Sequence, residues 1–377
     1  MKIGIDVTSA VNQTAGIGRY TRELVRELIR LDAEDDFFLH SFYGDTRVLE
    51  ERLGDRRLSV TSYDLNGRAL RLYALALSYA GLTPEHLLKP VDLFHVPDFS
   101  YPAPRKVPSV LTINDLIFMV HPEHFTWVNR TFMNRMAAFS AGNARKIIAI
   151  SESTKRDVVD LLGIPEEKIA VVYNGLGDQF APAAPEIVGE TTARLGITGP
   201  YVLYTGTLEP RKNIPVLIEA FNLCCRRAPE LTHRLVIAGK KGWLYEDIFR
   251  RVHELDLAER VVFTGYVADE DLVALYSGAD LFVFPSVYEG FGFPIIEAMA
   301  CEAPVICSSS SSLPEVAGDA ALFFTPNDHE RLADLILQVL GDAALRRGLI
   351  EKGKKNAARF PWSKTAAETL ALYKSVV

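Results

Sequence analysis

The chain has 377 residues, of which 48% are hydrophobic and 24% charged, enough apolar material for the cores of two domains of ordinary size. Its formal net charge of −7 argues against a nucleic-acid-binding protein held mainly by charge. The four cysteines show no metal-ligand spacing, which predicts reduced thiols in a cytoplasmic protein. We expect a strand and no signal peptide at the start, and no apolar run is long enough to span a bilayer.

A glycine loop follows the first predicted strand. Residues 2–7 predict a buried strand and residues 21–31 a helix, and the loop between them contains Gly16 and Gly18. This order is typical of the first crossover of a doubly wound parallel sheet, where ligands gather at the carboxyl ends of the strands. The third glycine of the dinucleotide-binding fingerprint is missing. The pattern leaves both a ligand site and a simple tight turn open.

Three further strands and an apolar helix follow in the first half of the chain. The helix, predicted over 68–79, carries a basic edge. It either touches a membrane or a lipid-linked acceptor, or belongs to the core of the first domain. The small number of basic residues favours the core. The strands are predicted over 37–43, 60–63 and 93–96.

Asn114 and Asp115 follow a predicted strand over 107–113. Polar residues at the carboxyl end of a strand are candidates for a ligand site. Asp115 has an equally good alternative, because aspartate often caps or turns the chain. Asn114 can hydrogen-bond a hydroxyl group but cannot titrate as a general base.

A domain boundary is predicted near the middle of the chain. Strands are expected over 146–151 and 169–172, with a helix between them that Ser151 would cap. A glycine-rich turn then leads to Pro182 and Pro185, and proline-rich segments often link domains. We therefore place the boundary after residue 178.

The second half begins again with a strand, predicted over 201–206, and a helix over 214–228. Arg211 and Lys212 stand directly before that helix. Two cations at a helix N-terminus oppose its dipole unless an anion binds there. Arginine suits bidentate contacts and lysine acts as a point charge, so the pair predicts a diphosphate site. The alternative is a pair of solvated surface cations.

Strands are also predicted over 234–238 and 261–264, and Tyr266 and Val267 follow the second of them. Asp269 and the acid two residues later form a D-x-D pattern, which in other proteins binds metal. Because it opens a predicted helix, we attribute it to capping and to the helix dipole. No metal site is predicted.

The segment over 289–300, EGFGFPIIEAMA, contains the strongest functional signal of the chain. It follows a strand predicted over 281–284 and opens a helix with Pro294 near its first position. The glycines allow close backbone approach, and the helix N-terminus attracts anions. Glu289 and Glu297 flank this corner and would hold neutral hydroxyl groups, which predicts a nucleotide sugar. Alternatively, Glu297 is an exposed first-turn acid that the dipole favours.

This motif resembles the Glu, seven residues, Glu signature of retaining glycosyltransferases of family 4. The resemblance implies an α/β protein of the GT-B fold, with two doubly wound Rossmann-like domains facing across a cleft. Residues 1–178 would form the acceptor-side domain and residues 179–361 the donor domain. The last helix, in residues 362–377, would cross back to the first domain.

The implied function is a retaining, metal-independent and cofactor-independent hexosyltransferase of polysaccharide biosynthesis. It would move a hexose from a nucleoside-diphosphate sugar to a glycan, a lipid-linked or a small-molecule acceptor. Mannose from GDP-mannose is preferred, because the GIGRY loop and the PRKN motif resemble those of bacterial mannosyltransferases. Glucose from UDP-glucose is the next choice. The protein would act in the cytoplasm, with peripheral contact to the inner face of the membrane left open.

The resemblance also assigns roles to residues. Glu289, Arg211, Lys212, Asn114 and Asp115 would form the catalytic group, although the family commonly has histidine where this chain has Asn114. Arg211 would replace a family arginine whose position is occupied by threonine here. The acceptor side would use Arg19 and Tyr20. The donor-binding group would be Gly16, Gly18, Gly206, Tyr266, Val267, Gly290, Phe291, Gly292, Phe293 and Glu297.

Other classes of protein remain open. Because Asn114 replaces the histidine that is common in the family, a donor-binding pseudo-glycosyltransferase without transfer activity is one alternative. A two-domain sugar-nucleotide epimerase is a second alternative. A sugar phosphorylase of similar fold would need a phosphate site or a pyridoxal lysine, and the sequence shows neither.

Overall fold

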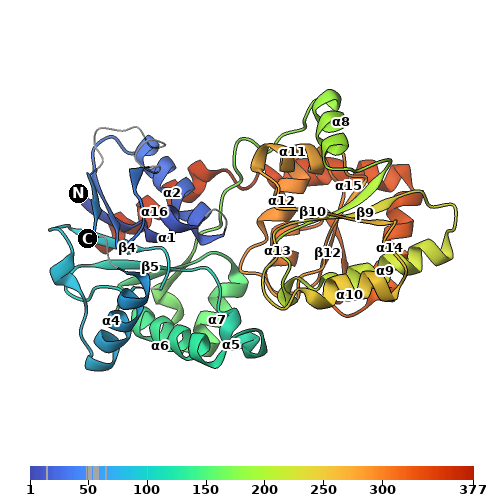
Figure 1. The fold of residues 1–377 in the computed structure, drawn as a ribbon. Helices are drawn as coiled ribbons and strands as arrows, with labels where there is room; N and C mark the ends of the chain where they lie inside the picture. The colour runs from blue at the N-terminus through green and yellow to red at the C-terminus, as the bar shows by residue number, and fades with distance from the viewer. Residues whose placement is uncertain (14–15, 48, 50–52, 54–58, 64–65, 100) are drawn as a thin grey trace. The chain divides into compact units, whose positions relative to one another are not determined.

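The chain forms two compact units in a computed structural model (Figure 1). Unit 1 consists of Met1–Gly175 and Pro361–Val377, and unit 2 of Leu176–Phe360. The boundaries were predicted after residues 178 and 361, and in the structure the chain divides after residues 175 and 360. The structure describes residues 1–13, 16–47, 49, 53, 59–63, 66–99 and 101–377.

Unit 1 is built on a parallel sheet of seven described strands, in the order β3-β2-β1-β4-β5-β6-β7. The direction in which successive strands are added reverses between β1 and β4, which is where open parallel sheets bind ligands. The predicted strands are all present, and most of them end one or two residues earlier than expected. Their bounds are β1 Lys2–Asp6, β2 Asp36–Ser41, β3 Ser59–Ser62, β4 Leu93–Val96, β5 Ser109–Ile113, β6 Lys146–Ala149 and β7 Ile169–Val171.

Helices connect these strands. The predicted cap of α7 is confirmed, because the Ser151 hydroxyl accepts a hydrogen bond from the Thr154 amide at 3.0 Å. The first long helix starts earlier than expected, since Gly16 already occupies its N-cap position. The helices are α1 Thr8–Asn12, α2 Ile17–Leu31, α4 Gly67–Ala80, α5 Ile117–Val120, α6 Trp127–Asn143, α7 Glu152–Leu162 and α16 Trp362–Val376.

The last helix, α16, packs on α2 within unit 1, so its predicted return to the first domain is confirmed. A buried polar network holds it there. The Tyr373 hydroxyl lies 2.5 Å from His95 Nδ1, and His95 Nε2 lies 2.8 Å from the Thr112 hydroxyl. Burial lowers the pKa of His95 to about 3, so the ring is neutral and bonds through both nitrogens.

Removing this contact tests how far α16 stabilises unit 1. Tyr373→Phe leaves His95 Nδ1 buried without its partner, and such an orphaned group costs about 1–3 kcal/mol. We expect the free energy of unfolding, measured by urea titration, to fall by that amount, with a lower midpoint. Tyr79→Phe is the matched control, because the Tyr79 side chain is exposed. Equal midpoints for Tyr373→Phe and the unchanged chain would show that the network is not stabilising.

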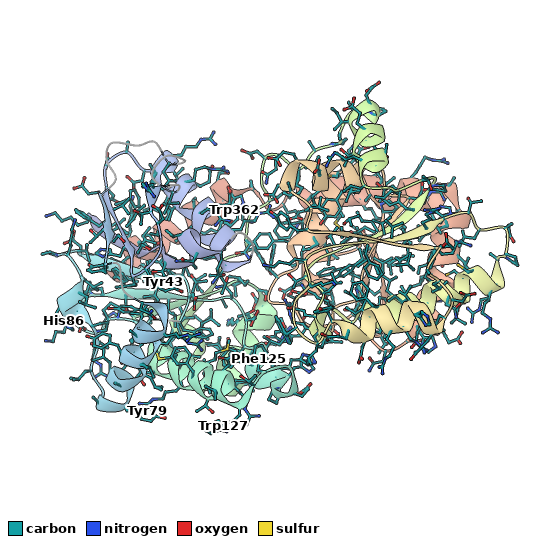
Figure 2. All side chains as sticks on the ribbon, viewed as in Figure 1. Tyr43, Tyr79, His86, Phe125, Trp127 and Trp362 are labelled. Carbon is teal, nitrogen blue, oxygen red and sulfur yellow. The ribbon has the colours of Figure 1, made fainter. Side chains whose placement is uncertain are left out.

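The helix α4 presents two different faces. Leu70, Ala74 and Ser78 are buried, in agreement with a core helix, whereas Leu72 and Tyr79 are exposed. Tyr79 and Trp127 point outward at the same margin of unit 1 in Figure 2. In the part of the chain that the structure describes, no helix has the length and apolar character needed to cross a membrane.

Unit 2 is built on a second parallel sheet, of six described strands in the order β10-β9-β8-β11-β12-β13. The edge strand β13 was not predicted. The bounds of β8, β9, β10 and β11 agree with the predicted ranges to within one residue. The strands of this sheet are β8 Tyr201–Thr205, β9 Arg234–Ala238, β10 Val261–Gly265, β11 Leu281–Phe284, β12 Val305–Ser308 and β13 Ala321–Phe324.

Two helices of unit 2 differ from the prediction, one at Pro185 and one at the D-x-D pattern. Pro185 does not lie in a linker but at the first position of α8, where its missing N–H is harmless. The acids of the D-x-D pattern lie in the first turn of α11, in agreement with the predicted role of the helix dipole, but the predicted capping role is wrong because the N-cap position belongs to Ala268. The helices are α8 Pro185–Arg194, α9 Ile214–Arg227, α10 Glu246–Glu254, α11 Asp269–Ser277, α12 Phe293–Ala300, α13 Leu313–Ala317, α14 His329–Gly341 and α15 Ala343–Ala357.

Candidate active site

The predicted cation pair and the 289–300 segment meet at one edge of the unit 2 sheet. β8 and β11 are parallel neighbours, with Leu281 opposite Val202. Their carboxyl ends therefore lie side by side, and strand order reverses between them as it does in unit 1. The loop after β8 carries Arg211 and Lys212, and the loop after β11 carries Glu289.

Four charged side chains form a compact cluster at this edge. Arg211 contacts Glu289 at 2.5 Å and Glu209 at 2.7 Å. Lys212 Nζ lies 2.6 Å from the other oxygen of Glu289. The Lys212 and Glu289 side chains are each only 10% exposed, which rules out solvated surface cations. The two positive and two negative charges balance, so the cluster is neutral until a ligand enters.

The electrostatics of the cluster keep Glu289 ionised. Burial alone raises the pKa of Glu289, but the charges of Arg211 and Lys212 outweigh it and hold that pKa at about 2. Burial and the neighbouring Arg211 lower the pKa of Lys212, and the two glutamates offset this only in part. Since Glu289 is a carboxylate at neutral pH and lies 2.6 Å away, we assign the proton to Lys212.

Backbone contacts join the two loops that carry these charges. The Val287 amide donates to the Arg211 carbonyl at 2.9 Å. Asn213 adopts a left-handed conformation with φ of 54°, and its side-chain amide donates to the Pro285 and Pro326 carbonyls. Asparagine tolerates this conformation better than most residues. The short 3₁₀ turn over Pro210–Lys212 is thus fixed against the β11 loop.

Serines from a third loop hold the backbone of Glu289. The Glu289 amide donates to the Ser311 hydroxyl at 2.8 Å. The Ser312 hydroxyl lies 2.9 Å from the Glu289 carbonyl and 2.8 Å from that of Phe291. This role was not predicted, although the run of five serines over 308–312 is a signal in the sequence for a polar loop that can form such hydrogen bonds. Such bracing reduces the movement of the Glu289 side chain.

Gly292 ends this loop and starts α12. Its φ of 110° is favourable only for glycine, and an added Cβ would lie 2.8 Å from Leu313 Cδ2. The helix begins at Phe293, with Pro294 in its first turn and no side-chain cap. The predicted glycine loop and helix N-terminus are therefore present, one residue earlier than expected. Gly290 and Phe291 are buried beside them, and Phe293 is half-buried.

Glu297 lies inside unit 2 and not on its surface. It is 2% exposed, and the Tyr276 hydroxyl donates to its Oε2 at 3.0 Å. The same hydroxyl lies 2.7 Å from Thr205, at the end of β8. The alternative of an exposed first-turn acid is therefore wrong. Whether Glu297 holds hydroxyl groups of a nucleotide sugar stays a prediction.

The remaining residues predicted to bind the donor lie at the carboxyl ends of β8 and β10. Tyr266 is 65% exposed, so it does not pack in the core, and Val267 beside it is half-buried. Gly206 follows β8 with φ of 144°, and its amide donates to Ala238 in the neighbouring strand. These positions are compatible with the predicted donor-binding role but do not test it.

The two glycines in the first loop of unit 1 are required by the local structure. A Cβ at Gly18 would lie 2.3 Å from the Gln13 carbonyl, so α2 can approach α1 only with glycine there. Gly16 has φ of 59° and open space around it. Arg19 is half-buried. Tyr20 is 1% exposed, and its hydroxyl lies 3.0 Å from Thr112. This corrects the prediction for Tyr20, whose side chain has no surface that an acceptor could contact.

Asn114 and Asp115 organise the loop after β5. The Asn114 amide donates to the Pro97 carbonyl at 2.9 Å, which ties this loop to the end of β4. Asp115 accepts a hydrogen bond from the Ile117 amide at 3.2 Å, at the start of α5. The turn interpretation of Asp115 thus has direct support. A catalytic role for either residue stays a prediction.

Comparison with known proteins defines the class of this fold. A family model described as Glycosyltransferase Family 4 matches residues 14–179, and one described as Glycosyl transferases group 1 matches residues 192–356. The chain is 31% identical to the O-antigen chain mannosyltransferase B of Escherichia coli over 372 aligned residues. The alignment covers 95% of this chain and 96% of that mannosyltransferase.

Two further similarities bear on the fold and on the length of the chain. Serotype-specific mannosyltransferase WbdA of Escherichia coli is 29% identical over 400 aligned residues, covering 97% of this chain and 47% of WbdA, so the chain spans about half of that protein. The crystal structure of Anabaena Alr3699/HepE in complex with UDP and glucose matches with a TM-score of 0.77 at 19% identity and covers 100% of both chains. That similarity supports the fold.

The protein is therefore a glycosyltransferase of the GT-B fold. It belongs to glycosyltransferase family 4, as the 289–300 motif led us to expect, and the predicted family and fold class are confirmed.

Proposed function

We propose that this glycosyltransferase is a metal-independent enzyme that transfers a hexose from a nucleoside-diphosphate sugar with retention of configuration. The main support is the buried cluster of Arg211, Lys212 and Glu289 at the carboxyl edge of the unit 2 sheet. Even paired charges lose much of their hydration when they are buried, so a buried charge cluster at this edge indicates a functional site. The place of the two cations beside the N-terminus of α12 suits the diphosphate of a donor.

In this proposal Arg211 and Lys212 stabilise the leaving group. Negative charge grows on the diphosphate as its bond to the sugar C1 breaks, and donors that are already in place lower the barrier. The acceptor hydroxyl attacks C1 on the same face, and its proton passes to the departing phosphate oxygen. That route needs no base from the protein, which agrees with asparagine at position 114.

Glu289 has a double role in the proposal. Each of its oxygens already contacts one cation, which fixes the positions of Arg211 and Lys212. A carboxylate oxygen has two lone pairs, so Glu289 can still accept hydrogen bonds from hydroxyl groups of the donor sugar. Glu297 would hold the ribose.

GDP-mannose is the proposed donor, with UDP-glucose as the second candidate. The support for mannose is the relationship to proteins named as mannosyltransferases. The acceptor would be a glycan, with lipid-linked and small-molecule acceptors as alternatives. Peripheral membrane contact would use the exposed Tyr79 and Trp127, and sedimentation with anionic vesicles would measure it.

Donor binding by the full chain tests this function. Isothermal titration calorimetry with GDP-mannose, UDP-glucose, GDP and UDP should show one base bound clearly more tightly than the other. At a hundred times its Kd, that ligand should stabilise the protein by about 2.7 kcal/mol in thermal unfolding. If no nucleotide or nucleotide sugar binds, the proposal fails.

A time course followed by NMR separates the alternatives. We expect slow hydrolysis of the bound donor in the absence of acceptor. Tight binding with neither hydrolysis nor transfer would identify a donor-binding protein without transferase activity. Conversion of the donor sugar to its epimer would identify an epimerase.

A further inference from the structure

A chain of three buried polar side chains runs from β8 through α11 to α12 in unit 2. The Thr205 hydroxyl lies 2.7 Å from the Tyr276 hydroxyl, and the Tyr276 hydroxyl donates to Glu297 Oε2 at 3.0 Å. Tyr276 has one proton to donate and gives it to Glu297, so the Thr205 hydroxyl is the donor in the other bond. Both hydrogen bonds therefore point toward the carboxylate.

All three side chains are shielded from water. Tyr276 is fully buried, and Thr205 and Glu297 are buried beside it. Burial, together with the charge of Glu297, raises the pKa of Tyr276 well above its usual value, so the hydroxyl keeps its proton and remains a donor. A buried carboxylate is costly without hydrogen bonds, and Tyr276 supplies one of them.

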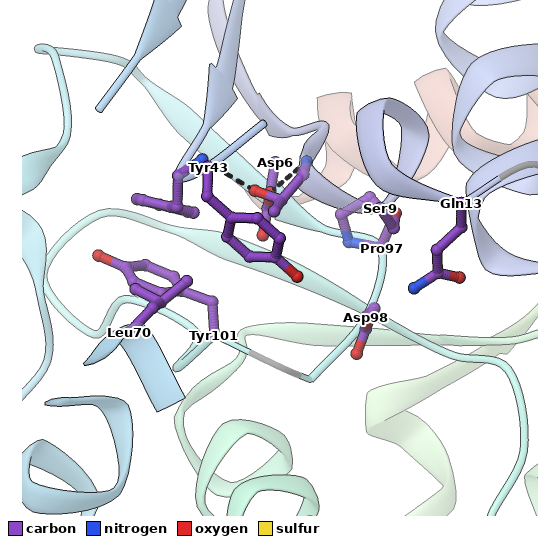
Figure 3. A pocket seen from close by; sticks show the side chains of 10 residues that line it. Asp6, Ser9, Gln13, Tyr43, Leu70, Pro97, Asp98 and Tyr101 are labelled. Atoms are coloured by element: carbon purple, nitrogen blue, oxygen red, sulfur yellow. Dashed lines mark hydrogen bonds between the residues drawn. The ribbon is translucent and has the colours of Figure 1, made fainter. Parts of the chain in front are cut away.

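A carboxylate in unit 1 shows what is particular about this contact. Asp6 ends β1 and is also buried, and it accepts a hydrogen bond from the Thr8 amide, two residues along the chain (Figure 3). Such local contacts form wherever an aspartate turns the backbone. Glu297 accepts its hydrogen bond from a side chain of another helix, so this contact requires a tyrosine at that one position.

The ring of Tyr276 is held independently of its hydroxyl. Its centroid lies 5.3 Å from that of Phe282 and 6.3 Å from that of Phe180, with the rings edge to face in both pairs. This packing involves the ring alone. Tyr276→Phe should therefore leave the ring in place, and the effect of the hydroxyl can be measured separately.

We propose that Tyr276 is a positioning residue, which holds Glu297 in the orientation that accepts a hydrogen bond from a ribose hydroxyl of the donor. It thereby makes the site select ribonucleotides over deoxyribonucleotides. A buried acceptor rejects a ligand that lacks the matching hydroxyl, because the acceptor then stays buried without that bond. A carboxylate that can turn to other partners discriminates less. The inference rests on the proposed function, which places a ribose at Glu297.

Calorimetry with the full chain tests this inference. The probes are GDP and its 2′-deoxy and 3′-deoxy forms, or the corresponding uridine nucleotides if UDP is the tighter ligand. In the unchanged chain we expect at least one deoxy form to bind about tenfold or more weakly than the ribonucleotide. In Tyr276→Phe this ratio should fall to about threefold or less, because Glu297 is no longer held. If neither deoxy form binds more weakly to the unchanged chain, the inference fails.

Tyr201→Phe is the matched control. Tyr201 is also buried, and its hydroxyl donates at 2.7 Å to the carbonyl of Leu275, the residue before Tyr276. Each substitution removes one buried hydroxyl from the same region, so both should lower the unfolding temperature. The ratio of deoxy to ribo binding should change only in Tyr276→Phe. Equal ratios in the two variants would show that Tyr276 has a structural role alone.

Position 205 provides a second and milder test. Thr205→Val keeps the shape of the side chain but removes the hydroxyl that donates to Tyr276, so the ratio should lie between those of the unchanged chain and Tyr276→Phe. Thr205→Ser retains a hydroxyl and should restore the ratio of the unchanged chain. The same ratio in Thr205→Val and Thr205→Ser would contradict a chain of bonds that points toward Glu297.

The same titrations keep this inference separate from the proposed function. Tight nucleotide binding with equal ratios in all variants would remove the role of Tyr276 and leave the transferase proposal intact. The absence of any nucleotide binding by the unchanged chain would remove both.

Discussion

Replacing Lys212 by methionine is expected to lower the transfer rate about 10²–10³-fold, the usual loss when one preorganised donor to a developing negative charge is removed. Methionine keeps the apolar stem that packs near Phe284, over whose ring the ammonium lies at 5.1 Å. Glu289 retains Arg211 as its partner at 2.5 Å. The fold should therefore survive, and the loss should lie in binding and chemistry.

Affinity for the free nucleoside diphosphate should fall with the rate. A hydrogen bond to a charged group contributes about 1.5–3 kcal/mol, so we expect a loss of about tenfold to a hundredfold by calorimetry. Lys354→Met is the matched control, because Lys354 is an exposed cation paired with Glu302 in the same unit. Unchanged nucleotide affinity in Lys212→Met would place Lys212 outside the donor site.

The second large effect is expected for Glu289→Gln, with a loss of about 10²-fold in rate. Glutamine cannot hold two cations, so Arg211 and Lys212 would move from the positions that the diphosphate requires, and a displacement of about 1 Å can cost that much. The variant should also be less stable, because it leaves buried cations without their carboxylate, which costs about 3–5 kcal/mol in comparable pairs. Because Arg211 keeps its ion pair with Glu209, we expect a loss of stability at the lower end of this range.

The stability difference should depend on pH with a definite sign. The pKa of Glu289 is held near 2, below the usual 4.5, so ionised Glu289 stabilises the folded state fully above about pH 4.5. The contribution is lost as pH falls from 4.5 toward 2. Unfolding midpoints of the wild-type chain and Glu289→Gln should therefore differ most at neutral pH and converge in acid.

Glu209→Gln provides a graded comparison. It removes one carboxylate from Arg211 but leaves Lys212 and Glu289 paired at 2.6 Å, so the rate should fall less than in Glu289→Gln. Near-normal transfer by Glu289→Gln, assayed below its unfolding temperature, would show that the cluster does not position the catalytic cations.

Much of the fold could be predicted because it follows from local patterns. Buried parallel strands such as β8 and β11 are short apolar runs, and Gly292 and Pro294 mark the corner between a strand and a helix. The edge strand β13 and the helix α8 were missed. Half of β13 is only partly buried, and α8 starts with a proline that resembles a linker signal.

By itself, then, the sequence determined the family, the two sheets, and the presence of cations and carboxylates at the turns after β8 and β11. Those signals depend on residues that are close together in the sequence, so they can be recognised without the tertiary structure. The tertiary structure decided which of these groups meet. It pairs Glu289 with Lys212 across 77 residues of chain, brings Ser311 and Ser312 to the Glu289 backbone, and buries Tyr20 under Thr112. Such contacts arise from packing between distant segments, and no local periodicity encodes them.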